Sequence, residues 1–135
     1  MRRADITPEL IELSKRAKEL GFPQDVEKGD WYGYVTYTDE LFVLGAGEMI
    51  CGVETEETKL YLILSFSRCL EWLVKRSWIL RLPYQKDSIK KDIEFSEWFD
   101  GEFTKQEVFI KGYLFMENPD LWVAKAVVRI LEREG

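Results

Sequence analysis

The sequence predicts an α+β fold in which three helices pack with a mostly antiparallel sheet of about five to six strands, as a layered α/β/α sandwich. Two segments begin with the capping residue and proline that often start a helix. Several other segments alternate apolar and polar residues, as strands with one buried face do. With 135 residues, 46% of them hydrophobic, the chain fits one domain over residues 1–135.

The first helix is predicted over residues 8–20. Thr7 can cap it and Pro8 suits its first position, where the missing N–H costs nothing. Apolar residues recur at steps of three and four, at Leu10, Leu13, Ala17 and Leu20. Gly21 can adopt the left-handed conformation that ends a helix, with Phe22 folding back and Pro23 preventing continuation.

Two further helices are predicted over 66–76 and 119–133. The first has an apolar stripe that includes Leu70 and Leu73, and either Ser65 or Ser67 can cap it. The last helix begins with a capping Asn118 followed by Pro119. Its apolar stripe comprises Val123, Ala124, Val127, Ile130 and Leu131.

The strands are predicted as two hairpins and two single strands. One hairpin joins residues 31–38 to 41–44, and single strands follow at 59–64 and 78–82. The second hairpin joins 93–99 to a strand over about 102–116, because Asp100-Gly101 favours a type I′ turn.

Charge is distributed unevenly along the chain. The net charge is −6, which argues against nucleic acid as the main partner. Residues 31–65 carry six acids and one base, residues 66–91 seven bases and two acids, and residues 92–118 seven acids and two bases. Either the solvated faces of ordinary elements or a basic patch on an acidic body would produce this distribution.

The chain offers few groups for catalysis or metal binding. It has no histidine and two cysteines, Cys51 and Cys69, which are not spaced as a zinc-binding pair. We therefore expect no metal, no cofactor and no histidine-dependent catalytic site. No signal peptide and no apolar run long enough for a membrane span are evident, so we expect a cytoplasmic protein with reduced thiols.

Two features of the sequence are candidates for chemistry. Gly45-Ala46-Gly47 resembles the start of a dinucleotide-binding loop, but Ile50 stands where the third glycine is needed. Acidic residues could share general acid and base work or hold a hard cation, although turns and exposed faces carry such residues for solubility. These acidic residues are Asp39 and Glu40, then Glu54, Glu56 and Glu57, and finally Glu94 and Glu97.

Aromatic residues are the most informative candidates for a binding site. They make up 14% of the chain and are concentrated in the two predicted hairpins. We expect Trp31, Tyr34 and Trp98 to contribute to a binding face, because Trp and Tyr dominate the energetics of protein interfaces. Part of the set must also be core, since alternate strand positions face opposite ways.

Several phrases of the sequence resemble small phage and prophage proteins of the phage ABA sandwich type. These phrases are Leu13-Ser14-Lys15-Arg16-Ala17-Lys18-Glu19-Leu20-Gly21-Phe22-Pro23-Gln24, Gly29-Asp30-Trp31-Tyr32, Ser67-Arg68-Cys69-Leu70-Glu71-Trp72-Leu73 and Asn118-Pro119-Asp120-Leu121-Trp122-Val123-Ala124-Lys125-Ala126. The chain departs from that group in residues 45–64. The resemblance implies an α/β/α arrangement and a phage or mobile-element origin, and it implies no activity.

We therefore expect a small accessory protein that binds another macromolecule, with a protein as the favoured partner. The alternative is a small carboxylate-dependent hydrolase or a nucleotide-binding enzyme, which would require acids to converge in one pocket. A homo-oligomer is a third interpretation, and it would require an unpaired sheet edge or an apolar patch matched across a two-fold axis.

Overall fold

The structure is a computed structural model that describes residues 1–36, 40–47, 59–81, 92–99, 102–111 and 118–134. Between residues 79 and 111 the description is limited to the backbone. The described helices are the 3-10 turn η1 (Arg3–Asp5) and the α-helices α1 (Pro8–Glu19), α2 (Phe66–Lys75) and α4 (Pro119–Glu134). The described strands are β1 (Trp31–Tyr34), β2 (Leu41–Val43), β3 (Leu60–Leu62), β4 (Trp78–Arg81), β5 (Asp92–Phe99) and β6 (Glu102–Lys111).

Helix α1 begins and ends as its sequence predicts. The Thr7 hydroxyl accepts a hydrogen bond from the Leu10 amide at 3.1 Å, and Pro8 follows as the first helical residue. Gly21 has a φ of 99°, in the left-handed region that glycine adopts without strain. The Phe22 amide donates to the Ala17 carbonyl and the Gly21 amide to the Lys18 carbonyl. These two bonds form a Schellman motif, so the predicted helix end is confirmed.

The other two predicted helices are also confirmed within one residue of their ends. Ser65, not Ser67, caps α2, because its hydroxyl accepts from the Arg68 amide. The Asn118 side chain accepts from the Leu121 amide at the start of α4. The two helix starts are joined, since the Phe66 amide donates to the Asp120 carboxylate at 2.6 Å. A carboxylate at this position also interacts favourably with the positive end of the α2 dipole.

The prediction of a single sheet with about five to six strands is wrong. The described strands form two separate antiparallel sheets of three, with strand orders β2-β1-β3 and β4-β5-β6. The overall α+β class holds. Both predicted hairpins are present, as β1 with β2 and as β5 with β6. The alternating pattern identified the strands, but it carries no information on which hairpins join into one sheet.

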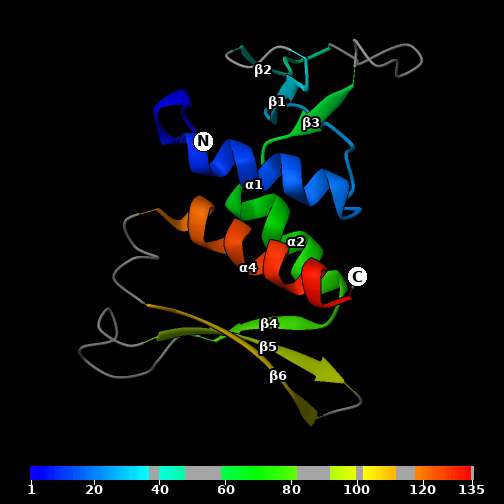
Figure 1. Cartoon of the computed structure of the whole chain (residues 1–135), viewed down its shortest axis with the longest axis vertical. Helices are drawn as coiled ribbons and strands as arrows, with labels where there is room; N and C mark the ends of the chain where they lie inside the picture. The colour runs from blue at the N-terminus through cyan, green and yellow to red at the C-terminus, as the bar shows by residue number, and fades with distance from the viewer. Residues whose placement is uncertain (37–39, 48–58, 82–91, 100–101, 112–117, 135) are drawn as a thin grey trace.

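The predicted α/β/α layering is also wrong, because the helices lie between the sheets (Figure 1). Helix α1 contacts β3 on one side and α4 on the other. Helix α2 leads from β3 of the first sheet to β4 of the second, and packs on α4. An alternating strand needs only one apolar layer against its buried face. One layer of helices that is apolar on more than one side can therefore serve both sheets.

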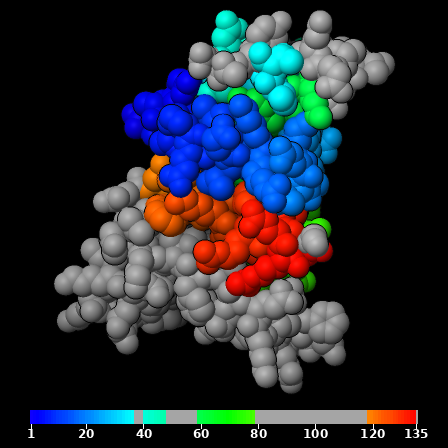
Figure 2. Space-filling model, viewed as in Figure 1, coloured from blue at the N-terminus to red at the C-terminus, as the bar shows by residue number. Residues whose placement is uncertain are grey.

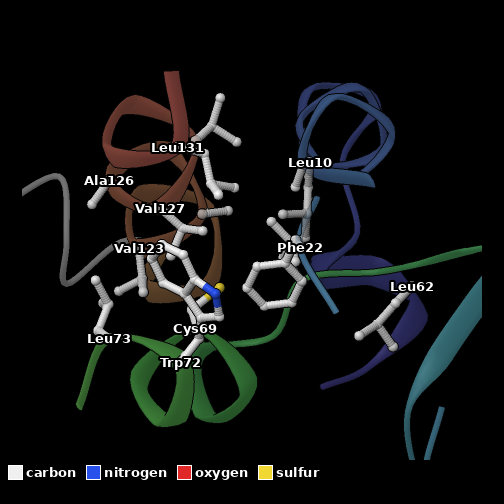
Figure 3. Packing of buried hydrophobic residues seen from close by; sticks show 14 of the residues in the cluster. Leu10, Phe22, Leu62, Cys69, Trp72, Leu73, Val123, Ala126, Val127 and Leu131 are labelled. Atoms are coloured by element: carbon white, nitrogen blue, oxygen red, sulfur yellow. The ribbon is translucent and has the colours of Figure 1, made fainter. Parts of the chain in front are cut away.

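The core lies where the three α-helices meet (Figure 3). Helix α4 is its central element and contributes eight buried residues, whereas α1 contributes Leu10, Ser14 and Ala17. Among the residues that the structure describes, Ser14 is the buried polar one, and its hydroxyl both donates and accepts a hydrogen bond. The hydroxyl donates to the Leu10 carbonyl at 2.8 Å and accepts from the Leu64 amide at 3.0 Å. Ser14 therefore joins α1 to the chain that leaves β3.

Candidate functional site

Three aromatic rings gather on the first sheet and form what we call the aromatic cluster: Tyr32, Tyr34 and Phe42. The ring centroids of Tyr32 and Tyr34 are 5.9 Å apart, and each lies 5.7 Å from the Phe42 ring. Such spacing and the tilted ring planes are favourable for aromatic pairs. The strand register explains the contact, because Tyr32 lies directly opposite Phe42 while Tyr34 is two positions further on the same face.

The aromatic cluster lies on the face of the sheet opposite α1. Gly33 points the other way, and there the Tyr61 ring lies against it. The Lys15 ammonium of α1 lies 5.3 Å from the centre of the Tyr61 ring, which identifies this as the helix-covered face. Because side chains alternate along β1, Tyr32 and Tyr34 must project to the opposite side.

Part of this region is exposed. Phe42 is 36% exposed and its neighbour Val43 is 46% exposed, whereas Tyr32 and Tyr34 are half-buried. Figure 2 shows residues 40–47, in cyan, at the surface beyond the blue atoms of α1. Because adjacent strand residues face opposite ways, Phe42 is the exposed residue on the face of the aromatic cluster, and aromatic side chains are enriched at protein interfaces. This end of the molecule is therefore the candidate interaction surface.

The structure separates the three residues that the sequence analysis selected for a binding face. Tyr34 belongs to the aromatic cluster. Trp31 lies on the opposite face of β1, where it packs against the core and its indole N–H donates to the Met1 carbonyl at 2.9 Å. Trp98 lies in β5 of the second sheet, opposite Phe103.

Phe42 is the residue that sequence reasoning missed. Its strand was predicted, but its position opposite Tyr32 depends on how the connection between β1 and β2 sets the register. The available signal was Tyr32 and Tyr34, which share one face by alternation. Aromatic residues in a sheet pair favourably with aromatic or β-branched residues on the neighbouring strand, so such a residue opposite Tyr32 could have been expected.

A second feature is a cleft of about 150 Å³ between α2 and the connection from α1 to β1. Arg68 of α2 is one of its lining residues and contacts the connection on the other side. The guanidinium is 3.4 Å from the Asp30 carboxylate, 3.5 Å from that of Glu27 and 4.0 Å from that of Glu71. It also donates to the Asp25 carbonyl. The described residues that line the cleft are Phe22, Pro23, Asp25, Glu27, Arg68, Glu71, Trp72 and Lys75.

The acids at this cleft interact with cations of the chain itself. Glu71 accepts a hydrogen bond from Lys75 at 3.0 Å, and this bond lowers the pKa of the Glu71 carboxyl. Among the described residues, no group of three histidine, cysteine, aspartate or glutamate side chains could hold a metal ion. The cleft is therefore best understood as a structural clamp between α2 and the connection to β1.

The structure describes only some of the acidic residues that the sequence offers for catalysis. Asp39, Glu54, Glu56 and Glu57 lie outside the described residues, as do Asp100-Gly101 and Cys51. Glu40 is exposed and immediately precedes β2. Glu94 and Glu97 lie in β5, opposite Arg81 and Trp78 of β4. Gly45-Ala46-Gly47 follows β2, and the residues directly after Gly47, where a phosphate-binding loop would enter its helix, lie outside the described ones.

Two buried titratable groups have raised pKa values. Burial raises the pKa of the Cys69 thiol, and the nearby Asp120 carboxylate adds to the effect. Burial also raises the pKa of Tyr61, with a further contribution from Glu12 that Arg3 partly offsets. A neutral thiol is a poor nucleophile, so Cys69 acts as a small apolar residue of the core.

We expect Tyr61→Phe to preserve the free energy of unfolding or to raise it by up to about 1 kcal/mol. The Tyr61 hydroxyl is buried and has no hydrogen-bond partner within the described part of the chain, so removing it relieves an unsatisfied group. Folding raises the pKa of Tyr61 above its unfolded value, near 10. The free energy of unfolding of the wild type is therefore independent of this group below that pH and falls as the pH rises above it, whereas that of Tyr61→Phe lacks this dependence. Urea unfolding of both proteins from neutral to alkaline pH measures this, and a loss above about 1 kcal/mol at neutral pH would contradict it.

Comparison with known proteins adds no assignment. No protein-family model matches the chain, and no curated protein or solved structure shows significant similarity to it. The resemblance to small phage proteins therefore stays a prediction. Within the described ranges, no helix is both long and apolar enough to cross a membrane.

Proposed function

We propose that this chain is a small cytoplasmic accessory protein, of phage or mobile-element type, that acts by binding another protein through the aromatic cluster. The observation that carries the proposal is the contact of Tyr32, Tyr34 and Phe42 on the sheet face opposite α1, with Phe42 exposed. Rigid aromatic side chains lose little conformational entropy on binding, and they recur among the residues that contribute most to protein interfaces.

The chemistry of the surrounding chain favours a basic protein as the partner. Residues 31–65 contain six acids and a single base, Lys59. Stacked bases could in principle occupy an aromatic surface, but the phosphates of a nucleic acid would be repelled by this excess of acid. In a protein segment with lysine or arginine beside an apolar side chain, the apolar side chain can pack on the aromatic cluster while the basic residue is attracted by the excess of acid.

Site-specific photocrosslinking tests the proposal. A photoreactive benzoylphenylalanine replaces Phe42 in one protein and Val74 in the control. Val74 is a suitable control because it is 62% exposed and apolar, yet lies on α2, away from the first sheet. We expect one discrete protein adduct from position 42 in cells of the native host, and no such adduct from position 74.

A second substitution distinguishes a specific binding site from non-specific hydrophobic binding. Tyr34→Ser in the protein that carries the probe at position 42 is expected to reduce the adduct by about tenfold, since truncating an interface aromatic typically costs 1 kcal/mol or more. Circular dichroism and a thermal midpoint verify that the variant is folded. Equal adducts from positions 42 and 74, adducts with nucleic acid alone, or no adduct at position 42 would each refute the proposal.

A further inference from the structure

The two edges of the first sheet differ in how their outward-facing backbone groups are satisfied. In the order β2-β1-β3, β3 forms one edge and β2 the other. Backbone groups of an antiparallel strand point alternately toward and away from the neighbouring strand. At each edge strand, every second residue therefore presents its N–H and C=O away from the sheet.

The β3 edge is closed by side chains of the preceding helix and connection. The Ile63 amide donates to the Trp31 carbonyl, so Ile63 faces β1 while Leu62 and Leu64 face away. The Leu62 amide donates to the side-chain carbonyl of Gln24 at 2.9 Å. The Leu64 amide donates to the Ser14 hydroxyl. These amides of β3 and its extension therefore cannot pair with another strand.

The β2 edge has no comparable closure among the described residues. The Leu44 amide donates to the Asp30 carbonyl, so Leu44 directs its N–H toward the strand that contains β1. By alternation Phe42 bonds with Tyr32, whereas Leu41 and Val43 direct their N–H and C=O away from β1. No side chain or strand in the described part of the chain bonds these outward groups. Figure 1 shows β2 at the outer side of the sheet, with β1 between it and β3.

We propose that β2 accepts an extended, basic segment of a partner protein as a fourth strand of the first sheet. This inference rests on the proposed function and specifies how the partner is held. The outward groups of Leu41 and Val43 supply backbone hydrogen bonds, as in other cases of strand addition. A side chain of the added strand that lies on the Phe42 face then contacts the aromatic cluster, because directly opposite residues share a face.

Charge determines which strand fits this edge. Asp39 and Glu40 directly precede β2, and Glu48 follows within five residues of Val43. A second copy of this chain would also carry a net charge of −6, with the same six acids and one base over residues 31–65. Molecules of like net charge repel each other, so a basic segment of another protein fits better than a second copy.

The probe for this inference is a short blocked peptide of alternating lysine and valine that carries fluorescein. Two matched peptides serve as controls, one with glutamate in place of lysine and one with alternate backbone amides methylated. We expect the lysine peptide to bind about tenfold more tightly than either control, as measured by fluorescence anisotropy at low salt. On binding, amide hydrogen exchange of Leu41 and Val43 should slow by about tenfold, while that of Phe42 should change little.

Two variants distinguish the contribution of the β2 edge to peptide binding from that of the aromatic cluster. Val43→Pro removes an outward N–H and places a ring at the open edge, where proline is tolerated in a sheet. Val43→Thr changes the side chain and retains the N–H. We expect Val43→Pro to lower the affinity for the lysine peptide by about tenfold and Val43→Thr to change that affinity little. Circular dichroism and a thermal midpoint show that the proline variant is folded.

The outcomes distinguish this inference from the proposed function. If the lysine peptide fails to bind, or binds without protecting Leu41 and Val43, strand addition is wrong while a protein adduct at position 42 still supports partner binding. If position 42 yields no protein adduct, both proposals are wrong. A dimer in analytical ultracentrifugation that Val43→Pro dissociates would overturn the basic partner in favour of a second copy.

Discussion

Replacing Gly33 with valine is expected to lower the free energy of unfolding by about 3 kcal/mol, although strand propensity alone favours valine. A β-carbon at Gly33 would lie 2.6 Å from both the Cζ and the hydroxyl oxygen of Tyr61, closer than packed atoms approach. The contacted ring is fully buried under Lys15 of α1, so it cannot move without opening the contact between α1 and β3. Urea unfolding of the variant and the wild type measures the difference.

A double-mutant cycle with Tyr61→Ala identifies the cause of this loss. If steric contact with the ring is responsible, Gly33→Val should cost at least about 1.5 kcal/mol less when Tyr61 is already alanine. An equal cost in both backgrounds would show that the glycine is needed for another reason, and the steric explanation would be wrong. The comparison is informative because the φ of Gly33 is not among the positive values, so valine can adopt its backbone conformation.

Replacing Arg68 with methionine is expected to lower the free energy of unfolding by about 2 kcal/mol. Arg68 and Asp30 are 15% and 13% exposed as side chains and lie 3.4 Å apart. Removing the guanidinium leaves a largely buried carboxylate without its cation, which is the costly half of a buried ion pair. Methionine retains the apolar stem, so the loss reports on the charge and its hydrogen bonds. Chemical denaturation at low and moderate salt measures it.

Lys75→Met is the matched control for Arg68→Met. Lys75 lies on the same helix and bonds the same Glu71, but its side chain is 73% exposed. Exposed pairs contribute little because water and salt screen them, so we expect a change below about 0.5 kcal/mol. If the two variants lost similar stability, the clamp between α2 and the connection to β1 would not depend on burial of the Arg68 pair.

The helices show how far local sequence can specify structure in this protein. Thr7, Pro8 and Gly21 define α1 through hydrogen bonds within a few residues of each other, and Asn118 begins α4 in the same way. The exact start of α2 was open between Ser65 and Ser67. In the structure Ser65 caps the helix, and the amide of the following Phe66 donates a hydrogen bond to Asp120 of α4, which is distant in the sequence.

The candidate site was only partly predictable. Tyr34 was selected from its own strand, and alternation placed Tyr32 beside it. Trp31 and Trp98 were selected for residue type, but one lies on the opposite face of β1 and the other lies in the second sheet. Phe42 joins the cluster through a register that depends on the geometry of the connection between β1 and β2.

The sequence by itself determined the α+β class, the three helices with their ends, and the two hairpins. Caps, proline, glycine and hydrophobic period act over a few residues, so they can be recognised without the rest of the chain. Only the tertiary structure decided that the strands divide into two sheets on either side of one helical layer, and that Gln24 and Ser14 close one sheet edge while none of the described residues closes the other. These features depend on contacts between residues far apart in the chain, and hydrophobic burial, which drives such contacts, is non-directional and does not encode which surfaces meet.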